Sequence, residues 1–405
     1  MIVSTAVTGG YVVPVDGEPV EGGTVLIDNG VIVAVGAEAD VDIPDDAEIV
    51  DASGTWVLPG FVEAHGHLGV YEEGDGWAGL DVNEMTDPNG ARLRALDGIN
   101  PDDQGFRDAL AGGVTTVVVK PGSGNPIGGQ TVAVKSWGRT VEDMLVREPV
   151  SVKSALGENP KRVYGDQNKL PSTRLGVAAV IRDAFTKAQD YREAREWAIR
   201  EGKPFERDNT QEIMVRVLEG ELPWCQHSHR ADDIATAIRL SEEFGYRLIV
   251  NHGTEGHLLA DTLAAKDIPV IMGPLIVGRS KVEVRRRSMR NPGIMARAGV
   301  KIAMTTDHPV VPIDYLVHQA TFAVKEGLDS ETALRSITIN PAEIMGLGDR
   351  VGALRPGLDA DIVLWSGDPL DVMSRAVRVF VNGRDVYHFD ESTGEGRTTN
   401  PFYTE

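Results

Sequence analysis

The sequence has one cysteine, Cys225, among its 405 residues. A single cysteine cannot form an internal disulfide, and the first ten residues lack the basic and apolar regions of a secretory signal peptide. No apolar run approaches the ~20 residues that a membrane-spanning helix needs. These absences predict a cytoplasmic protein without a membrane partner.

Positive charge is also scarce, because 40 Lys and Arg stand against 61 Asp and Glu, giving a formal net charge of -21. Phosphate binding requires clustered Lys and Arg, so a nucleic-acid partner is not expected. One basic cluster interrupts this background, formed by Arg279, Lys281, Arg285, Arg286, Arg287 and Arg290. It indicates either a solvated helix face or subunit contact, or a patch near a site mouth that attracts an anionic substrate.

The two ends of the chain share one kind of pattern. Val- and Ile-rich segments with closely spaced turn signals predict short antiparallel strands in residues 1–55 and again in residues 346–390. Neither piece is large enough for a good core, so we expect the two to form one small β-sandwich. The polar, aperiodic tail after Tyr387, with residues 391–405 as a separate segment, is expected to be disordered or loosely packed.

Residues 56–345 alternate between short β-branched runs and amphipathic helical stretches, a pattern typical of a parallel sheet with crossover helices. The helices are clearest at residues 173–200 and 232–244. Eight alternations in one segment predict an α/β fold, specifically a (β/α)₈ TIM barrel. The eight runs end before His65, at Lys120, at Lys135, at Lys153, at His227, at His252, at Met272 and at Asp307.

The first of these runs ends in two histidines one residue apart, His65 and His67. Residues i and i+2 of a strand point to the same side, so both imidazoles can aim at one point beyond the strand end. In a barrel, the carboxyl ends of all strands face a common mouth. Imidazoles and a carboxylate gathered there suit zinc, manganese, iron or nickel. The further candidates at strand ends are His227, His229, His252 and Asp307.

Lys153 is the unusual member of this set, because an ammonium group beside a divalent cation is repelled. It fits only if it is neutral. A lysine deprotonated by burial and nearby positive charge can react with carbon dioxide to form a carbamate that bridges two metal ions.

Five motifs along the chain are distinctive: residues 58–67, 112–116, 306–309, 338–342 and 356–364. Their ensemble resembles the amidohydrolase superfamily, with its imidazolonepropionase-like branch as the nearest likeness, and the resemblance covers nearly the whole chain. It implies that the more buried metal is held by His65, His67 and Asp307. It further implies that His227 and His252 hold a second metal, that Lys153 is the carboxylated bridge, and that the protein is a homo-oligomer.

Two ligand positions stay open. The fifth run offers His227 and His229, which alternation places on the same side of a strand. His227 is favoured because the ligand of the resembling family usually opens a His-x-acidic or His-x-His pair. Glu158, five residues after Lys153, could replace that lysine as a carboxylate ligand.

The predicted mechanism follows from charge. Two cations would lower the pKa of a bridging water to give hydroxide near neutral pH, while one of them polarises the substrate carbonyl. Asp307 would take the proton and pass it to the leaving nitrogen. We therefore expect a metal-dependent hydrolase of the EC 3.5 type that acts on an amide or cyclic amide of a small molecule. The alternatives are a deaminase of a ring imine or amidine and, less favoured because all ligands are retained, a non-catalytic scaffold.

Substrate-binding residues are harder to predict. Residues 68–105 form an acidic stretch that indicates either a solvated loop or a lid, in which Glu84 with His229 could hold a third ion. Arg174 and Arg230 are either ordinary arginines or clamps for a substrate carboxylate. The glycine-dense residues 121–130 favour a tight turn at the site rim over an anion-binding cradle.

Overall fold

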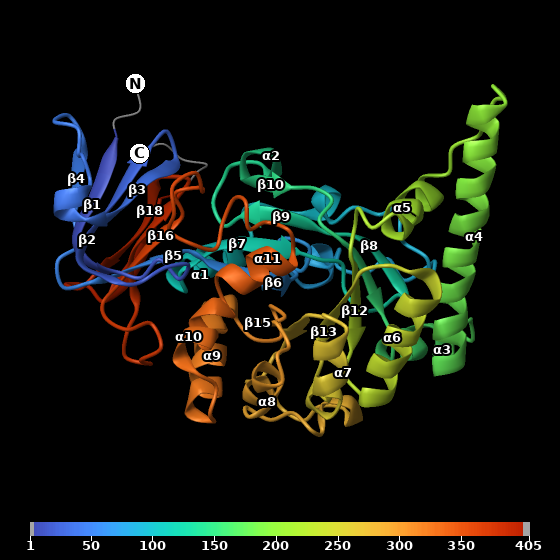
Figure 1. Cartoon of the computed structure of the whole chain (residues 1–405). Helices are drawn as coiled ribbons and strands as arrows, with labels where there is room; N and C mark the ends of the chain where they lie inside the picture. The colour runs from blue at the N-terminus through green and yellow to red at the C-terminus, as the bar shows by residue number, and fades with distance from the viewer. Residues whose placement is uncertain (1–3, 400–405) are drawn as a thin grey trace.

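The computed structural model describes residues 4–399, which form a mixed α/β fold with three sheets. The first and last strands of the chain lie together in a nine-stranded sheet, at the left of Figure 1. Its N-terminal strands are β1 (Thr5–Val12), β2 (Val20–Asp28), β3 (Val31–Ala37), β4 (Glu48–Asp51) and β5 (Trp56–Pro59). Its C-terminal strands are β16 (Ile362–Trp365), β17 (Ala376–Val381), β18 (Arg384–Asp390) and β19 (Glu395–Thr398).

The two ends of the chain meet where β5 pairs antiparallel with β16. On its other edge β5 pairs parallel with β1, so β5 lies between the N-terminal and C-terminal strands. Val57, Ile362 and Phe380 share one buried apolar cluster with side chains from β1 and β2. The burial of this cluster stabilises both ends as one unit.

The expectation of a disordered or loosely packed tail after Tyr387 is wrong for the described residues up to 399. β18 continues to Asp390, and β19 pairs with it antiparallel. The connecting turn is stabilised by Asp390, which accepts a hydrogen bond from Ser392 N, and by Gly394 at φ 72°. An edge strand needs backbone partners more than apolar side chains, which is why a polar sequence can form it. Residues 400–405 lie outside the described residues.

The central strands form two further sheets. The four-stranded sheet has the order β10-β9-β7-β6, with β6 (Phe61–Gly66), β7 (Val114–Val119), β9 (Val132–Lys135) and β10 (Leu145–Arg147). The six-stranded sheet has the order β15-β14-β13-β12-β11-β8, with β8 (Ile127–Gln130), β11 (Val152–Ala155), β12 (Trp224–Ser228), β13 (Leu248–His252), β14 (Val270–Met272) and β15 (Ile302–Met304).

All eight predicted runs contain strands, but not all of these strands are parallel. β9 pairs antiparallel with β7, and β8 pairs antiparallel with β11. Residues 120–131 between β7 and β9 contain no helix. A parallel neighbour requires a crossover that is usually helical, so this short connection returns the chain in the opposite direction.

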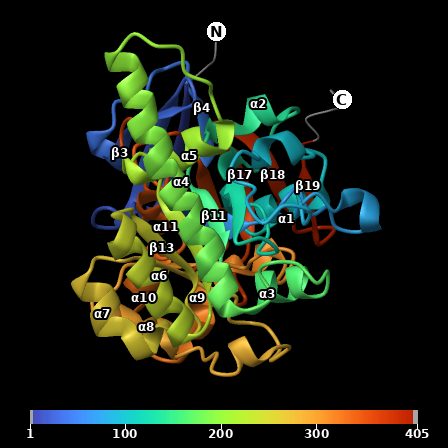
Figure 2. The ribbon, with the colours of Figure 1, turned by 90° about the vertical axis from the view of Figure 1, so that its right-hand side faces the viewer.

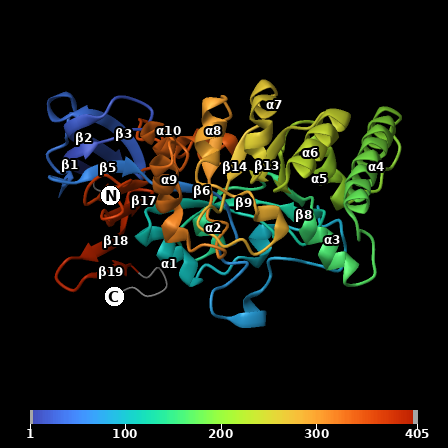
Figure 3. The ribbon, with the colours of Figure 1, turned by 90° about the horizontal axis from the view of Figure 1, so that it is seen from below.

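Helices cover one side of the central sheets, where α6 to α10 follow one another in Figures 1 and 3. The predicted helices are present as α4 (Arg174–Arg200) and α6, which ends at Gly245 with φ 76°. Phe185 of α4 packs on Trp224 of β12, with ring centroids 4.9 Å apart. The other helices are α1 (Gln104–Ala111), α2 (Val141–Met144), α3 (Glu158–Gly165), α5 (Asn209–Leu218), α7 (Ala260–Ala265), α8 (Asn291–Arg297), α9 (Leu316–Lys325), α10 (Ser330–Arg335) and α11 (Ile339–Ile344), with α6 spanning Ala231–Phe244.

Among residues 4–399, no helix combines the length and the apolar character that crossing a membrane requires.

Candidate metal centre

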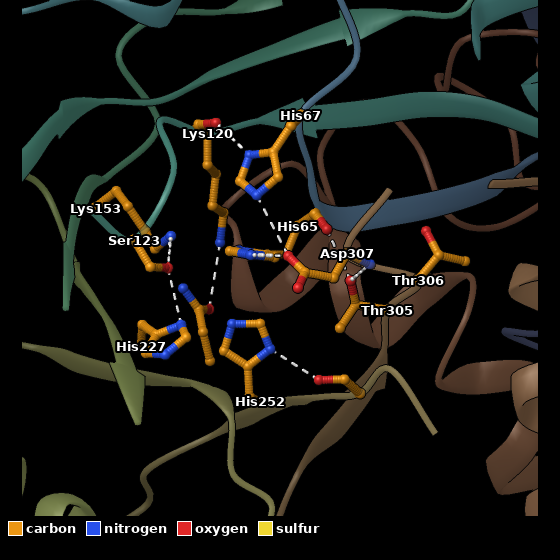
Figure 4. Close-up of polar contacts among 12 residues, drawn as sticks. His65, His67, Lys120, Ser123, Lys153, His227, His252, Thr305, Thr306 and Asp307 are labelled. Carbon is orange, nitrogen blue, oxygen red and sulfur yellow. Dashed lines mark hydrogen bonds and ion pairs between the residues drawn. The ribbon is translucent and has the colours of Figure 1, made fainter. Parts of the chain in front are cut away.

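The predicted histidines and Asp307 converge at the carboxyl ends of the central strands, in two groups of three. Figure 4 shows all of these residues except His229. Within each group the potential ligand atoms all lie within 4.8 Å of one another. The ring centroids of His65 and His252 are 4.9 Å apart, so the groups adjoin. The first group is His65, His67 and Asp307, and the second is His227, His229 and His252.

The first group is built from the end of β6 and the segment after β15. His65 Nε2 lies 2.9 Å and His67 Nε2 lies 3.3 Å from the same carboxylate oxygen, Oδ1 of Asp307. Burial alone would raise the pKa of Asp307. The charge of His252 and the contacts from His65 and His67 outweigh burial and hold this pKa well below its usual value.

Two cross-links hold the segments of the first group together. Thr305 Oγ1 donates to His65 O at 2.7 Å and accepts from Asp307 N at 3.0 Å. Glu63 accepts from His65 N at 2.9 Å and from both N and Oγ1 of Thr306 at 2.8 Å. Asp307 has φ 55°, a left-handed conformation that costs a non-glycine residue free energy. These hydrogen bonds stabilise that conformation.

Each imidazole of the second group is oriented through its Nδ1 atom. His252 Nδ1 donates to Gly273 O at 2.8 Å, while His229 Nδ1 lies 2.8 Å from Thr254 Oγ1. His227 Nδ1 lies 2.8 Å from the hydroxyl of Ser123, which is drawn in Figure 4. A hydrogen bond at one ring nitrogen leaves the other free to bind a metal ion.

The free nitrogens of this group fit a metal ion. Within the described residues, the buried Nε2 atoms of His227 and His252 have no hydrogen-bond partner. Burial lowers the pKa of His227 and His229 well below the usual value, and that of His252 to about 4. Neutral imidazoles with unpaired nitrogen atoms are the donor set that a divalent cation requires.

Lys153 is the second residue of β11 and is fully buried. Its Nζ donates to Ser123 Oγ at 3.0 Å and to Pro121 O at 3.2 Å. Burial lowers the pKa of Lys153 to about 7. Glu158, the other residue considered for this role, begins α3 and belongs to neither ligand group.

Comparison with known proteins identifies the family. The model of the amidohydrolase family matches residues 159–387, which is more than half of the chain. The chain belongs to this family. An amidohydrolase from Thermotoga maritima has a crystal structure that is 45% identical in sequence, with a TM-score of 0.92, and the match covers 95% of this chain and all of that one.

Two curated relatives agree with this assignment. An imidazolonepropionase from Rhizorhabdus wittichii is 28% identical over 372 residues, covering 85% of this chain and 88% of the relative. The amidohydrolase tasK from Hapsidospora irregularis is 29% identical over 388 residues, which cover 89% of this chain but only 39% of that protein. The resemblance to the amidohydrolase superfamily is therefore confirmed, and it indicates a hydrolase that acts on C–N bonds.

Two buried residues of the amidohydrolase site escaped the sequence analysis. Lys120 directly follows β7, and its Nζ lies 3.4 Å from Asn251 Oδ1 and 3.6 Å from Cys225 Sγ. Its position at the end of a β-branched run matches that of Lys153, and this similarity could have revealed it. Glu63 lies two residues before His65, so strand alternation could have placed it on the same side.

The glycine-dense residues 121–130 form part of the site rim. A Cβ atom at Gly124 would lie 2.7 Å from Asn83 Oδ1, and one at Gly122 would collide with the same side chain. Gly124 N instead donates to Asn83 Oδ1 at 2.8 Å. These glycines make room for Asn83 and thereby hold Ser123 against His227 and Lys153.

The remaining predicted residues lie outside the two ligand groups. Glu84 is exposed and accepts a hydrogen bond from Thr86 Oγ1 at 2.6 Å. Arg174 is already paired with Asp233 at 3.1 Å and with Glu283 at 2.7 Å. Arg230 is paired with Asp232 at 2.7 Å. The proposed clamps are thus engaged by the amidohydrolase's own carboxylates.

The basic side chains of residues 279–290 contact different parts of the protein. Arg286 pairs with Glu255 at 3.6 Å, and Arg290 pairs with Glu326 at 2.9 Å. Lys281 faces inward, where its charge contributes, after burial, to the lowered pKa of both His227 and His229.

Proposed function

We propose that this protein is a metal-dependent amidohydrolase that hydrolyses an amide or cyclic amide bond of a small molecule. The observation that carries the proposal is the contact between the two ligand groups, whose nearest rings, those of His65 and His252, are 4.9 Å apart. This spacing suits two neighbouring cations that act on one substrate.

In this proposal, His65, His67 and Asp307 hold one cation, and His227 and His252 hold the other, with His229 beside them. Zinc is the first candidate, and manganese, iron or nickel would also fit imidazole and carboxylate donors. When bound, the cations supply Lewis acidity that activates water and polarises the scissile carbonyl. A third ion beside Glu84 has no support from the position of that side chain.

Asp307 is the proposed proton carrier. Both imidazole contacts use Oδ1 of Asp307, which leaves Oδ2 to accept a proton from water. The side chain is 17% exposed and therefore reaches the space that water and substrate enter. Protonated Asp307 then delivers the proton to the leaving nitrogen, so that the amine departs neutral.

Lys153 is proposed to carry a carbamate. Its nitrogen attacks carbon dioxide, a C–N bond forms, and one proton is released to solvent. A pKa of about 7 supports this reaction, because much of the amine is unprotonated at neutral pH. The carbamate would then bridge the two cations.

We also infer that residues 56–345 close into a (β/α)₈ barrel and that residues 1–55 and 346–390 form a separate β-sandwich. Backbone hydrogen bonds between the two central sheets support closure. Val150 N donates to Thr131 O at 2.9 Å on one side, and His67 N donates to His308 O at 3.0 Å on the other. A homo-oligomer, implied by the family, is to be tested by sedimentation.

The decisive experiment combines metal quantification with product analysis. Purified protein is expected to contain up to two divalent ions per chain and to release a carboxylate and an amine from a panel of small amides. Ammonia release from ring imines without amide cleavage would favour the deaminase alternative. Failure to bind zinc or manganese would favour the non-catalytic scaffold.

A further inference from the structure

A recess of about 460 Å³ opens outside both ligand groups. Its walls come from α3, the start of α4, the residue before α6, and the 3-10 turn η5 (Val282–Val284). The three helices lie on the face that is turned to the viewer in Figure 2. Four basic residues line it, an unusual concentration in a chain with a net charge of -21: Lys161, Arg162, Arg174 and Arg230.

The recess adjoins the second histidine group through short segments of chain. Arg230 directly follows His229, and α3 begins five residues after Lys153. Leu156 N, just before α3, donates to His227 O at 3.0 Å. The walls therefore begin within a few residues of the ends of the ligand-bearing strands, which brings the recess next to the second histidine group along the chain.

Lys281 adds a positive charge beside the recess wall. Its Nζ donates to Asn159 Oδ1 at 3.1 Å and lies 3.7 Å from Glu283 Oε2 on that wall.

The four basic side chains differ in how far they are already engaged. Arg174 is held by Asp233 and Glu283, and Arg230 uses Nε and Nη2 to bind Asp232. Within the described residues, Lys161 and Arg162 form no salt bridge, although both are exposed to the recess. They are therefore free to bind a ligand.

Three carboxylates also line the recess and could repel an anionic ligand. Glu283 is offset by Arg174 and by Lys281. Glu158 and Asp166 lie at the two ends of α3, as its first residue and its C-cap. Lys161 and Arg162 lie three and four residues after Glu158, on the same side of the helix, yet within the described residues no ion pair joins either cation to it.

We propose that this recess binds a carboxylate of the substrate through Arg162 and Lys161, and that the substrates are small amides carrying a carboxylate away from the scissile bond. The proposal rests on the hydrolase function proposed above. Arginine pairs with a carboxylate through two parallel hydrogen bonds, which gives orientation as well as affinity.

The test uses two probes of equal size, N-acetylglycine and its neutral analogue N-acetylglycinamide. Their binding to the full-length protein is measured by calorimetry or by ligand-detected NMR. Wild type is expected to bind the carboxylate about tenfold more tightly or better, as hydrogen bonds to charged groups imply. The double variant Lys161→Gln with Arg162→Gln should lose this preference. The matched control, Lys187→Gln on the exposed face of α4, should keep it.

Two results would overturn the proposal: equal binding of the two probes by wild type, or a double variant that behaves like Lys187→Gln. Because binding is read without turnover, the two proposals can fail separately. A carboxylate preference in a protein that hydrolyses no amide would overturn the hydrolase function alone. Hydrolysis without charge preference would overturn the recess assignment alone.

Discussion

The two ligand groups of this amidohydrolase are built differently. The first contains a carboxylate, Asp307, whose Oδ1 receives contacts from both of its histidines, and Glu63 and Thr305 tie its two segments together. The second consists of three imidazoles, each oriented by a separate neighbour, and two of their buried nitrogens are unpaired within the described residues. Within the described residues, the first group is braced through its carboxylate and leaves one buried nitrogen, His65 Nδ1, without a partner, whereas the second has no carboxylate and leaves two.

The largest effect is expected from Asp307→Asn, which removes the proton carrier and the negative charge of the first group. Turnover should fall by about 10²–10⁴-fold. Steady-state kinetics, with circular dichroism and metal content on the same sample, separate lost chemistry from lost folding. A variant with the wild-type rate would contradict the assigned role.

Stepwise removal of metal tests whether the two ligand groups differ in metal affinity. Because only the first group supplies an anionic ligand, stepwise chelation should remove the ion at the second group first. Activity should disappear with that step and return on adding zinc. The variant His227→Gln should retain only the metal ion of the first group, which is held tightly. The variant His67→Gln should retain only the metal ion of the second group, which is held more weakly. Equal retention by both variants would show that the groups do not differ in affinity.

Glu63→Gln tests the bracing of the first group. The amide keeps the size of the side chain but replaces an acceptor with a donor beside His65 N and Thr306 N. Metal affinity at the first group should fall by about 10–100-fold, as for other outer-shell partners of ligands. Competition with a chromogenic chelator measures the metal affinity. An unchanged affinity would show that Thr305 alone is sufficient to hold the two segments of the first group in place.

The smallest effect concerns the pH dependence of metal-free protein. Burial lowers the pKa of Lys153 from 10.5 to about 7, so between these values the unfolded chain binds the proton and the folded chain does not. Stability should therefore rise with pH through this window, by at most about 1.4 kcal/mol per unit. Lys153→Met should flatten the rise in thermal unfolding scans, and an unchanged slope would contradict the lowered pKa.

The ligand positions were predictable because several β-branched runs end in a histidine or an aspartate, and the structure brings these residues together. His65, His67 and Asp307 could be grouped in this way. The third run was predicted as a strand and is present as β9, but its antiparallel direction and the additional strand β8 were missed, because periodicity defines a strand but not its direction. The direction depends on whether the connection contains a crossover helix, and residues 120–131 contain none.

The partners of charged side chains were beyond prediction for a different reason. Arg174 lies far along the chain from Asp233 and Glu283, and only the packing of α4 against α6 and η5 brings them together. The end of its run could have marked Lys120 as a candidate, but not what it contacts, since Cys225 and Asn251 lie on other strands. Pattern predicts which face a residue occupies, but contacts between distant segments decide what it binds.

The position of β5 between β1 and β16 has a consequence for synthesis of the protein. A nascent chain must extend past Trp365 before the open edge of β5 can be paired. Until then the ribosome presents an apolar strand edge of the kind that promotes association between chains. Premature termination anywhere before β16 would leave that edge unpaired and permanently available to chaperones and proteases.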